Sequence, residues 1–187
     1  MGVSPTVLFG GAFDPPHLGH VAVADGARRR FGVARLVVLV GERPAHREVH
    51  APAADRLALA RAAFPADDVR LDPYPRTVEL LRAERFADPV LVIGADEFRG
   101  FPGWVEPDEI LERARLAVAA RPGYPRRELE RVVRRLRRPD RVVFFEIEPS
   151  PAASTEARRR VAAGEPLDGL VPPAVARLIE ERRLYRP

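Results

Sequence analysis

The chain of 187 residues carries a formal net charge of +4, from 31 basic and 27 acidic residues, and contains no cysteine. The lack of cysteine excludes disulfide frameworks, thiolate metal sites and cysteine nucleophiles. No segment approaches the roughly 20 uninterrupted apolar residues of a membrane span, and no signal-peptide pattern opens the chain, so we expect a cytoplasmic protein without a membrane partner.

Six short apolar runs alternate with segments of helical periodicity. The runs are Val7 to Phe9, Leu36 to Val40, Val69 to Leu71, Val90 to Ile93, Leu116 to Ala119 and Val142 to Ile147. Continuous valine-rich runs of this length are typical of strands that are covered on both faces. Because strands that alternate with helices are joined by right-handed crossovers, the pattern predicts a doubly wound α/β fold with a mainly parallel sheet. We expect one domain that spans residues 1–187.

Apolar spacing predicts seven helices between and after these runs. They are Leu18 to Phe31, Ala54 to Phe64, Thr77 to Phe86, Asp108 to Ala114, Arg127 to Arg137, Thr155 to Ala163 and Pro173 to Leu184. Two long segments that contain proline, Gly41 to Pro52 and Phe98 to Pro107, are predicted to be loops. Both follow strands, where open α/β sheets bind their ligands.

The most basic stretch of the chain, Arg126 to Arg141, has its apolar residues on one helical face. We interpret it as a solvated amphipathic helix. A polyanion-binding patch, as in an RNA-binding module, is the alternative. The modest net charge does not require a nucleic-acid partner and is equally compatible with small anionic substrates.

The segment GGAFDPPHLGH, residues 10–20, follows the first predicted strand. Gly10 and Gly11 allow a tight turn and a close approach of a ligand to the backbone. His17 and His20 are three residues apart at a helix start, so their side chains can point to the same side, beside unpaired amides. Amides, helix dipole and imidazole together favour an anion, most naturally phosphate. A zinc site and a purely structural role are the alternatives.

This segment closely resembles the signature loop of the HxGH nucleotidyltransferases, specifically the bacterial nicotinate-nucleotide adenylyltransferases. The resemblance implies a Rossmann-like nucleotidyltransferase fold and the transfer of AMP from ATP to nicotinate mononucleotide, with release of pyrophosphate. It implies catalytic roles for His17 and His20 at the ATP phosphates, with His20 stabilising charge on the pentacoordinate phosphorus. The ATP contacts that it implies in and beside this loop are Phe9, Gly10, Gly11, Ala12 and Gly19. We expect Mg²⁺ to arrive with the triphosphate and expect no metal site on the protein.

Near the C-terminus, the residues from Ser154 to Arg158 resemble the second motif of the superfamily, ISSTxxR. The resemblance assigns Ser154, Thr155 and Arg158 to the β- and γ-phosphates of ATP. One hydroxyl of the full motif is missing here, and Ser150 could replace it. An ordinary helix cap with a surface arginine is the alternative. If the resemblance holds, positively polarised groups from the two ends of the chain meet around one triphosphate.

Two motifs lie between these ends. The segment Ile93-Gly94-Ala95-Asp96 resembles the IGxD segment of the family, which implies contacts of Gly94 and Asp96 with ATP, the aspartate facing a ribose. A local cap is the alternative role for this aspartate. The segment Phe101-Pro102-Gly103-Trp104 resembles the FPxW loop, whose tryptophan stacks on the pyridine ring. Packing in the core is the alternative for Trp104.

The remaining correspondences concern the mononucleotide. The segment from Pro44 to Arg47 resembles PPHK or PPHR, which places His46 and Arg47 toward the phosphates, and an exposed loop is the alternative. Thr77 is retained from the YTxxTL segment, whereas Arg76 stands at its tyrosine position. An arginine near a carboxylate would be favourable, but this mismatch leaves the choice between acid and amide open.

Three other functions remain open at this point. Pantetheine-phosphate adenylyltransferases share the implied fold, although they have TxGH in place of His17-Leu18-Gly19-His20 and lack the FPGW loop. The incomplete second motif and the altered Arg76 segment are compatible with a nucleotide sensor that does not turn over. An RNA-binding module would show binding that depends steeply on salt.

Overall fold

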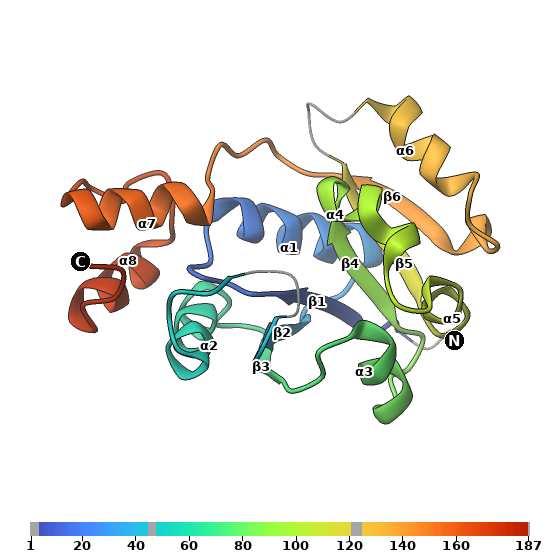
Figure 1. Ribbon diagram of the computed structural model, residues 1–187, viewed down its shortest axis with the longest axis horizontal. Helices are drawn as coiled ribbons and strands as arrows, with labels where there is room; N and C mark the ends of the chain where they lie inside the picture. The colour runs from blue at the N-terminus through green and yellow to red at the C-terminus, as the bar shows by residue number, and fades with distance from the viewer. Residues whose placement is uncertain (1–3, 45–47, 121–124, 187) are drawn as a thin grey trace.

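The computed structural model describes residues 4–44, 48–120 and 125–186. Its strands form one sheet in the order β3-β2-β1-β4-β5-β6 (Figure 1), and each neighbouring pair is parallel. The strands are β1 (Val7–Gly11), β2 (Val37–Gly41), β3 (Asp68–Asp72), β4 (Val90–Gly94), β5 (Arg115–Ala120) and β6 (Val142–Glu146). The six predicted runs therefore correspond to the six strands, and the predicted doubly wound α/β fold is confirmed.

Eight helices and two short 3-10 turns connect the strands within the described residues. They are α1 (Leu18–Phe31), α2 (Ala53–Ala63), α3 (Thr77–Ala83), α4 (Ala95–Gly100), η1 (Phe101–Gly103), α5 (Pro107–Arg113), α6 (Arg126–Val133), η2 (Pro139–Arg141), α7 (Ser154–Ala163) and α8 (Pro173–Glu181). All seven predicted helices are present, although α2 and α5 end one residue earlier than predicted, and α3, α6 and α8 end three or four residues earlier. None of the helices in the described part of the chain is long and apolar enough to cross a membrane.

The prediction of a loop from Phe98 to Pro107 is wrong in its first half, where α4 and η1 lie. A helix of six residues is too short to show a periodic pattern. Phe98 and Phe101 are fully buried in the core, so tertiary packing rather than local propensity stabilises these turns.

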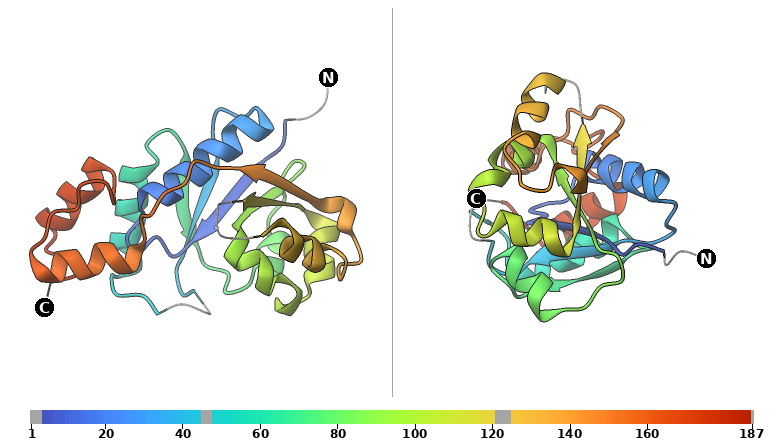
Figure 2. Two further views of the ribbon diagram at one scale, coloured as in Figure 1. Left: turned by 90° about the horizontal axis from the view of Figure 1, so that it is seen from above. Right: turned by 90° about the vertical axis from the view of Figure 1, so that its right-hand side faces the viewer.

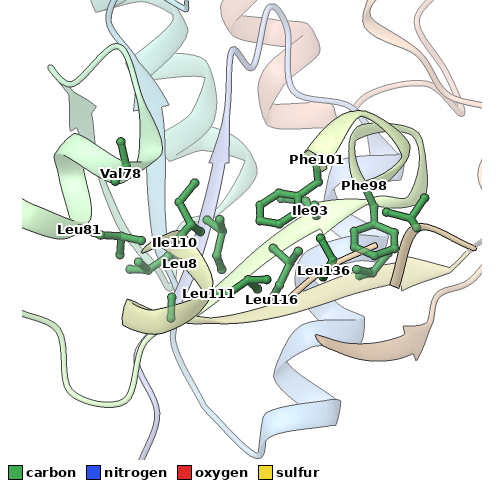
Figure 3. Packing of buried hydrophobic residues seen from close by; sticks show 14 of the residues in the cluster. Leu8, Val78, Leu81, Ile93, Phe98, Phe101, Ile110, Leu111, Leu116 and Leu136 are labelled. Atoms are coloured by element: carbon green, nitrogen blue, oxygen red, sulfur yellow. The ribbon is translucent and has the colours of Figure 1, made fainter. Parts of the chain in front are cut away.

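The strands place alternate residues on the two faces of the sheet, and each face has its own core. On β1, Leu8 joins the cluster under α3, α4, α5 and α6, while Val7 and Phe9 join the cluster under α1 and α2. Figure 3 shows the first cluster, in which Phe98 and Phe101 pack beside the β4 residue Ile93. Burial on both faces explains why the strands are apolar without alternation.

The basic helix α6 packs its apolar face into this same cluster. Leu129 and Val132 are 2% and 9% exposed, which confirms the predicted amphipathic pattern. Two of the nearby guanidinium groups form ion pairs at the surface: Arg137 lies 3.1 Å from Asp108, and Arg138 lies 2.9 Å from Asp140. The helix thus has a structural function in covering the sheet.

The last two helices pack against α2 and form a third apolar cluster. Figure 2 shows α7 and α8 gathered at the end of the molecule that lies opposite α5 and α6. Leu59 of α2, Ala157 of α7 and Val175 of α8 are fully buried there. An ion pair between Arg182 and Asp55 (2.6 Å) also joins α8 to α2. The backbone N–H of Leu18 donates to the carbonyl oxygen of Leu170 (2.8 Å), so the C-terminal segment is also held beside the β1–α1 connection.

Candidate functional site

A cavity of about 480 Å³ opens where β1 and β4 end. These strands are neighbours at the point where the strand order reverses, the usual ligand position in doubly wound sheets. The cavity is lined by every residue for which the sequence predicts a catalytic or ATP-binding role: Phe9, Gly10, Gly11, Ala12, His17, Gly19, His20, Gly94, Asp96, Ser154, Thr155 and Arg158. Segments from both ends of the chain thus meet around one space.

The turn after β1 leaves room for a ligand over the backbone. A Cβ atom built on Gly10 would meet no heavy atom within 4 Å, so this position faces open space. A Cβ on Gly11 would lie 3.0 Å from the ring of Phe13, which is only 1% exposed. Gly10 therefore opens the floor of the cavity, and Gly11 allows the loop to fold its phenylalanine inward.

The two histidines of the HxGH segment lie face to face at the start of α1. Their ring centroids are 3.7 Å apart with an angle of 32° between the planes, as predicted for side chains on one side of the helix start. The backbone N–H of His17 donates a hydrogen bond to Nδ1 of His20 (3.1 Å). Because Nδ1 accepts, the proton of the neutral His20 ring lies on Nε2, which is its donor.

Gly19 explains why this motif contains a glycine. A Cβ at this position would lie 2.9 Å from Cε1 and Nδ1 of His17 and 3.4 Å from the carbonyl oxygen of Ala152. The missing side chain lets the imidazole of His17 lie over the first turn of α1. It also lets the segment before α7 approach this turn.

Hydrogen bonds fasten the C-terminal segment directly to the loop. Ser154 Oγ donates to the carbonyl oxygen of Pro15 (2.8 Å), and Arg158 Nη1 donates to the carbonyl oxygen of Asp14 (2.6 Å). The N-cap of α7 is Ala153, so the alternative role of Ser154 as an ordinary helix cap is wrong. Both side chains thus tie the second motif to the first.

Ser150 does not supply the missing hydroxyl contact. It does not line the cavity, and its Oγ accepts a hydrogen bond from the backbone N–H of Ala152 (3.3 Å). Ala152 and Ala153, which precede Ser154 in the motif, line the cavity without a hydroxyl. The expectation for Ser150 is therefore not supported.

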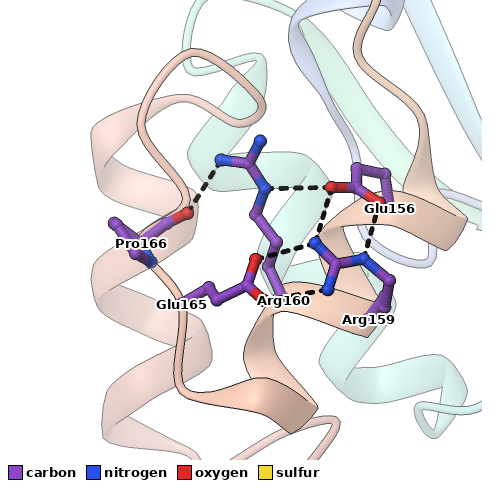
Figure 4. A network of polar contacts seen from close by, with 5 residues as sticks. All are labelled: Glu156, Arg159, Arg160, Glu165 and Pro166. Carbon is purple, nitrogen blue, oxygen red and sulfur yellow. Dashed lines mark hydrogen bonds and ion pairs between the residues drawn. The ribbon is translucent and has the colours of Figure 1, made fainter.

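Of the three consecutive arginines on α7, only Arg158 lines the cavity. Figure 4 shows that the other two belong to a network on the outside of the helix. Arg159 binds Glu156 and Glu165, and Arg160 binds Glu156 and the carbonyl oxygen of Pro166. The two guanidinium groups lower the pKa of Glu156 to about 2, so this carboxylate stays charged. The network leaves Arg158 as the arginine of this run that faces inward.

Asp14, which sequence reasoning quoted but gave no role, is a buried anchor of the loop. It is 4% exposed, and its carboxylate accepts hydrogen bonds from the backbone N–H groups of His50 (2.6 Å) and Ala51 (3.1 Å). The hydroxyl of Tyr185 donates a third bond (2.8 Å). Burial and the nearby charge of Asp14 raise the pKa of Tyr185 well above its usual range, so this hydroxyl remains a donor. An aspartate is unexpected in a loop suited to binding anions, and this could have indicated that its side chain points into the protein rather than toward the ligand.

Sequence reasoning also missed Arg56, because arginines on helices are common in this chain. This side chain is 1% exposed and donates to four backbone carbonyl oxygens: those of Ala51 (3.1 Å), Ala12 (2.9 Å), Gly41 (2.7 Å) and Glu42 (2.9 Å). Burial lowers the pKa of Arg56, and the charge of Asp14 opposes this change. Arg56 thus holds together the segments that follow β1 and β2.

A second cavity of about 190 Å³ adjoins the first and shares Gly10, Gly11, Ala12 and Glu97 with it. Thr77 and Trp104, both predicted to bind the mononucleotide, line it. The ring of Trp104 lies 5.3 Å from that of Phe101, so this side chain packs on the core and also borders the cavity. His46 and Arg47 lie outside the described residues.

The wall of the smaller cavity contains Asp72 and Tyr74, which the sequence did not single out. The backbone N–H of Tyr74 donates to Asp72 Oδ1 (3.0 Å), and burial raises the pKa of this carboxyl group. Arg76 is not part of the lining. Its side chain is 55% exposed and lies 3.6 Å from Glu79, so the structure does not place a guanidinium here from this position.

Gly94 and Asp96 line the larger cavity at the end of β4. A Cβ on Gly94 would lie 2.4 Å from Oδ1 of Asp96, so only glycine allows the carboxylate to fold back over the end of β4. Asp96 lies in the first turn of α4 and lines the cavity. The strand end and the helix start together fix its position.

Comparisons with known proteins agree with this geometry. The cytidylyltransferase-like family matches residues 8–161. Proteins named probable nicotinate-nucleotide adenylyltransferases are similar to this chain: that of Rubrobacter xylanophilus is 34% identical over 96% of this chain and 91% of its own length, and that of Thermus thermophilus is 36% identical over 96% and 98%.

The fold also resembles a solved structure of Plasmodium falciparum nicotinic acid mononucleotide adenylyltransferase in complex with NaAD. That match has a TM-score of 0.79 at 14% identity and covers 98% of each chain, which is a likeness of fold. The family match and the sequence relatives carry the assignment of the family. This chain belongs to the nicotinate-nucleotide adenylyltransferases, within the cytidylyltransferase-like nucleotidyltransferases.

Proposed function

We propose that this chain, acting as one domain, transfers the AMP group of ATP to nicotinate mononucleotide. An oxygen of the mononucleotide phosphate attacks the α-phosphorus in line, the bond from this phosphorus to the bridging oxygen breaks, and pyrophosphate leaves. The reaction needs no covalent intermediate on the enzyme, because positioning and charge stabilisation suffice for such a transfer. A cytoplasmic location belongs to the same proposal.

One observation carries this proposal. The HxGH loop and the second motif, from opposite ends of the chain, line a single cavity and are joined by the bonds from Ser154 and Arg158. Two helix starts, those of α1 and α7, therefore adjoin one space. The dipoles of both helices favour an extended polyanion such as a triphosphate at these N-termini.

In this proposal His17 and His20 bind the ATP phosphates. His20 Nε2 donates to the charge that develops on the pentacoordinate phosphorus, since its Nδ1 is held by the backbone of His17. Thr155 and Arg158 hold the β- and γ-phosphates at the other side of the cavity. Ser154 keeps its lone pairs and its place beside them, while its proton fastens the loop.

The remaining ATP contacts surround these groups. Asp96 pairs with ribose hydroxyls at the end of β4, where Gly94 lets the nucleotide approach. Phe9, Gly10, Gly11, Ala12 and Gly19 form the floor of the cavity. The described residues contain no group of three or more His, Asp or Glu side chains that could hold a metal ion. Mg²⁺ enters this proposal as the counterion of the triphosphate, whose charge it neutralises.

The smaller cavity takes the mononucleotide in this proposal. Trp104 offers an aromatic face to the pyridine ring, and Thr77 lies across the same space. His46 and Arg47 remain proposed ligands of the mononucleotide. The shared wall from Gly10 to Ala12 would bring the acceptor phosphate beside the α-phosphorus of ATP.

The test is the release of pyrophosphate from ATP and Mg²⁺ with three acceptors in parallel. Nicotinate mononucleotide, its amide analogue and phosphopantetheine differ in the group that the smaller cavity must accept. We expect the first to give the highest kcat/KM. Two results would contradict the proposal. One is release of pyrophosphate with phosphopantetheine and neither mononucleotide; the other is no release with any of the three acceptors although ATP binds measurably.

A further inference from the structure

Tyr185 joins the end of the chain to the HxGH loop. Its hydroxyl donates a hydrogen bond of 2.8 Å to Oδ1 of Asp14, across 171 residues of sequence. Its backbone has φ = 61°, in the left-handed region that a residue with a side chain adopts only when its surroundings hold it there. The tail is therefore fixed in the conformation that directs the hydroxyl to this carboxylate.

Asp14 links Tyr185 to the loop that carries His17 and His20. Its carboxylate also holds the amides of His50 and Ala51, and its own carbonyl oxygen accepts from Arg158. Asp14 is followed by two prolines and then by His17, the N-cap of α1, so little flexible chain separates the anchor from the first imidazole. A shift of the Asp14 side chain would displace the start of α1.

We propose that Tyr185 is a positioning residue for adenylyl transfer, acting through Asp14 on the loop that carries His17 and His20. The inference rests on the proposed function and extends it to the C-terminal tail. Tyr185 lines neither cavity and touches no predicted substrate group. Loss of the Tyr185 hydroxyl should therefore lower kcat, because a displacement of about 1 Å at catalytic groups can cost about 100-fold in rate.

The first test compares Tyr185→Phe with Ile179→Val. The first substitution removes only the hydroxyl, while the second removes one methylene from the C-terminal cluster, where Ile179 is 2% exposed. We expect Tyr185→Phe to lower kcat about 10- to 100-fold, with the KM for each substrate within about twofold. Both substitutions should lower the Tm by a similar small amount, but Ile179→Val should leave kcat unchanged. Equal losses of kcat in the two variants would overturn the proposal.

A second measurement needs no substrate. The amides of His50 and Ala51 donate to Asp14, so hydrogen exchange at these two positions reports directly on the anchor in the free protein. We expect faster exchange in Tyr185→Phe and unchanged exchange in Ile179→Val. Exchange at the wild-type rate in Tyr185→Phe would overturn the proposal. If the wild-type chain transferred no AMP at all, the proposed function would fail while this measurement still tested the anchor.

Discussion

The two neighbouring cavities are built in different ways. The larger is lined mainly by two nearly continuous segments, residues 9–20 and 152–158, which meet through hydrogen bonds of Ser154 and Arg158. The smaller is lined by short runs and single residues from strands, loops and helices spread between Gly10 and Trp104. A short motif at a helix start carries its own geometry, because its glycines and prolines act locally. A wall collected from distant elements depends on the whole fold.

The largest expected effect concerns the donor in the larger cavity. His20→Ala should retain the fold and lose about 100- to 1,000-fold in turnover, the usual cost of a preorganised donor to a developing charge. Pyrophosphate release and a thermal melt measure the two properties. Turnover near the wild-type rate would remove His20 from the mechanism.

Two further variants at this position sharpen the result. The amide of glutamine reaches the place of Nε2, whereas the amide of asparagine reaches only the place of Nδ1. Since Nδ1 is occupied by the backbone N–H of His17, His20→Gln should recover part of the lost rate and His20→Asn should not. Recovery of the rate by His20→Asn would show that the catalytic donor is Nδ1 and not Nε2.

The next effect tests whether one residue supports both cavities. Arg56 holds the carbonyl oxygens of Ala12, which borders both cavities, and of Gly41, which borders the smaller. Arg56→Met leaves these buried acceptors unpaired, so we expect it to lower the free energy of unfolding by about 2–4 kcal/mol. It should also raise the KM for both substrates.

Arg61 on the same helix supplies the matched control for Arg56. Its side chain is exposed and makes a long contact of 3.4 Å with the carbonyl oxygen of Val69. Arg61→Met should change the free energy of unfolding, measured in urea, by less than about 0.5 kcal/mol. Similar losses in the two variants would show that Arg56 acts only through general helix stability.

These two cavities also show which parts of the fold and the site can be predicted from the sequence. The strands and most helices follow from apolar runs and spacing, and residues 10–20 predict the position of the larger cavity because their chemistry is local. Arg56 and Tyr185 escape prediction, since nothing near them in the sequence shows which side chains turn inward. Arg76 shows the opposite error, because a position within a motif does not determine whether a side chain reaches the cavity. The α4 turn depends on the burial of Phe98, which only the assembled core provides.

A smaller effect tests the role of the aromatic wall in the smaller cavity. Trp104→Ala should raise the KM for nicotinate mononucleotide about 10-fold, because stacking on an aromatic side chain contributes about 1–3 kcal/mol. The KM for ATP should stay within about twofold, and Trp104→Phe should retain most of the affinity. An equal rise in both KM values would indicate that the loss of packing on Phe101 disturbs the whole site.

The smallest effect is on stability and concerns Asp72. Burial raises the pKa of its carboxyl group, with Glu84 adding to this and the N–H of Tyr74 and the charge of Arg70 opposing it. The folded state therefore binds this proton more tightly than the unfolded state, and stability falls as the pH rises from the ordinary aspartate pKa of about 4 through the raised value. Asp72→Asn has no such charge, so it should be more stable than the wild type at pH 7, with the difference vanishing near pH 3. Urea unfolding at the two pH values measures this, and a difference that grows toward acid pH would mean that the ionised carboxylate stabilises this wall.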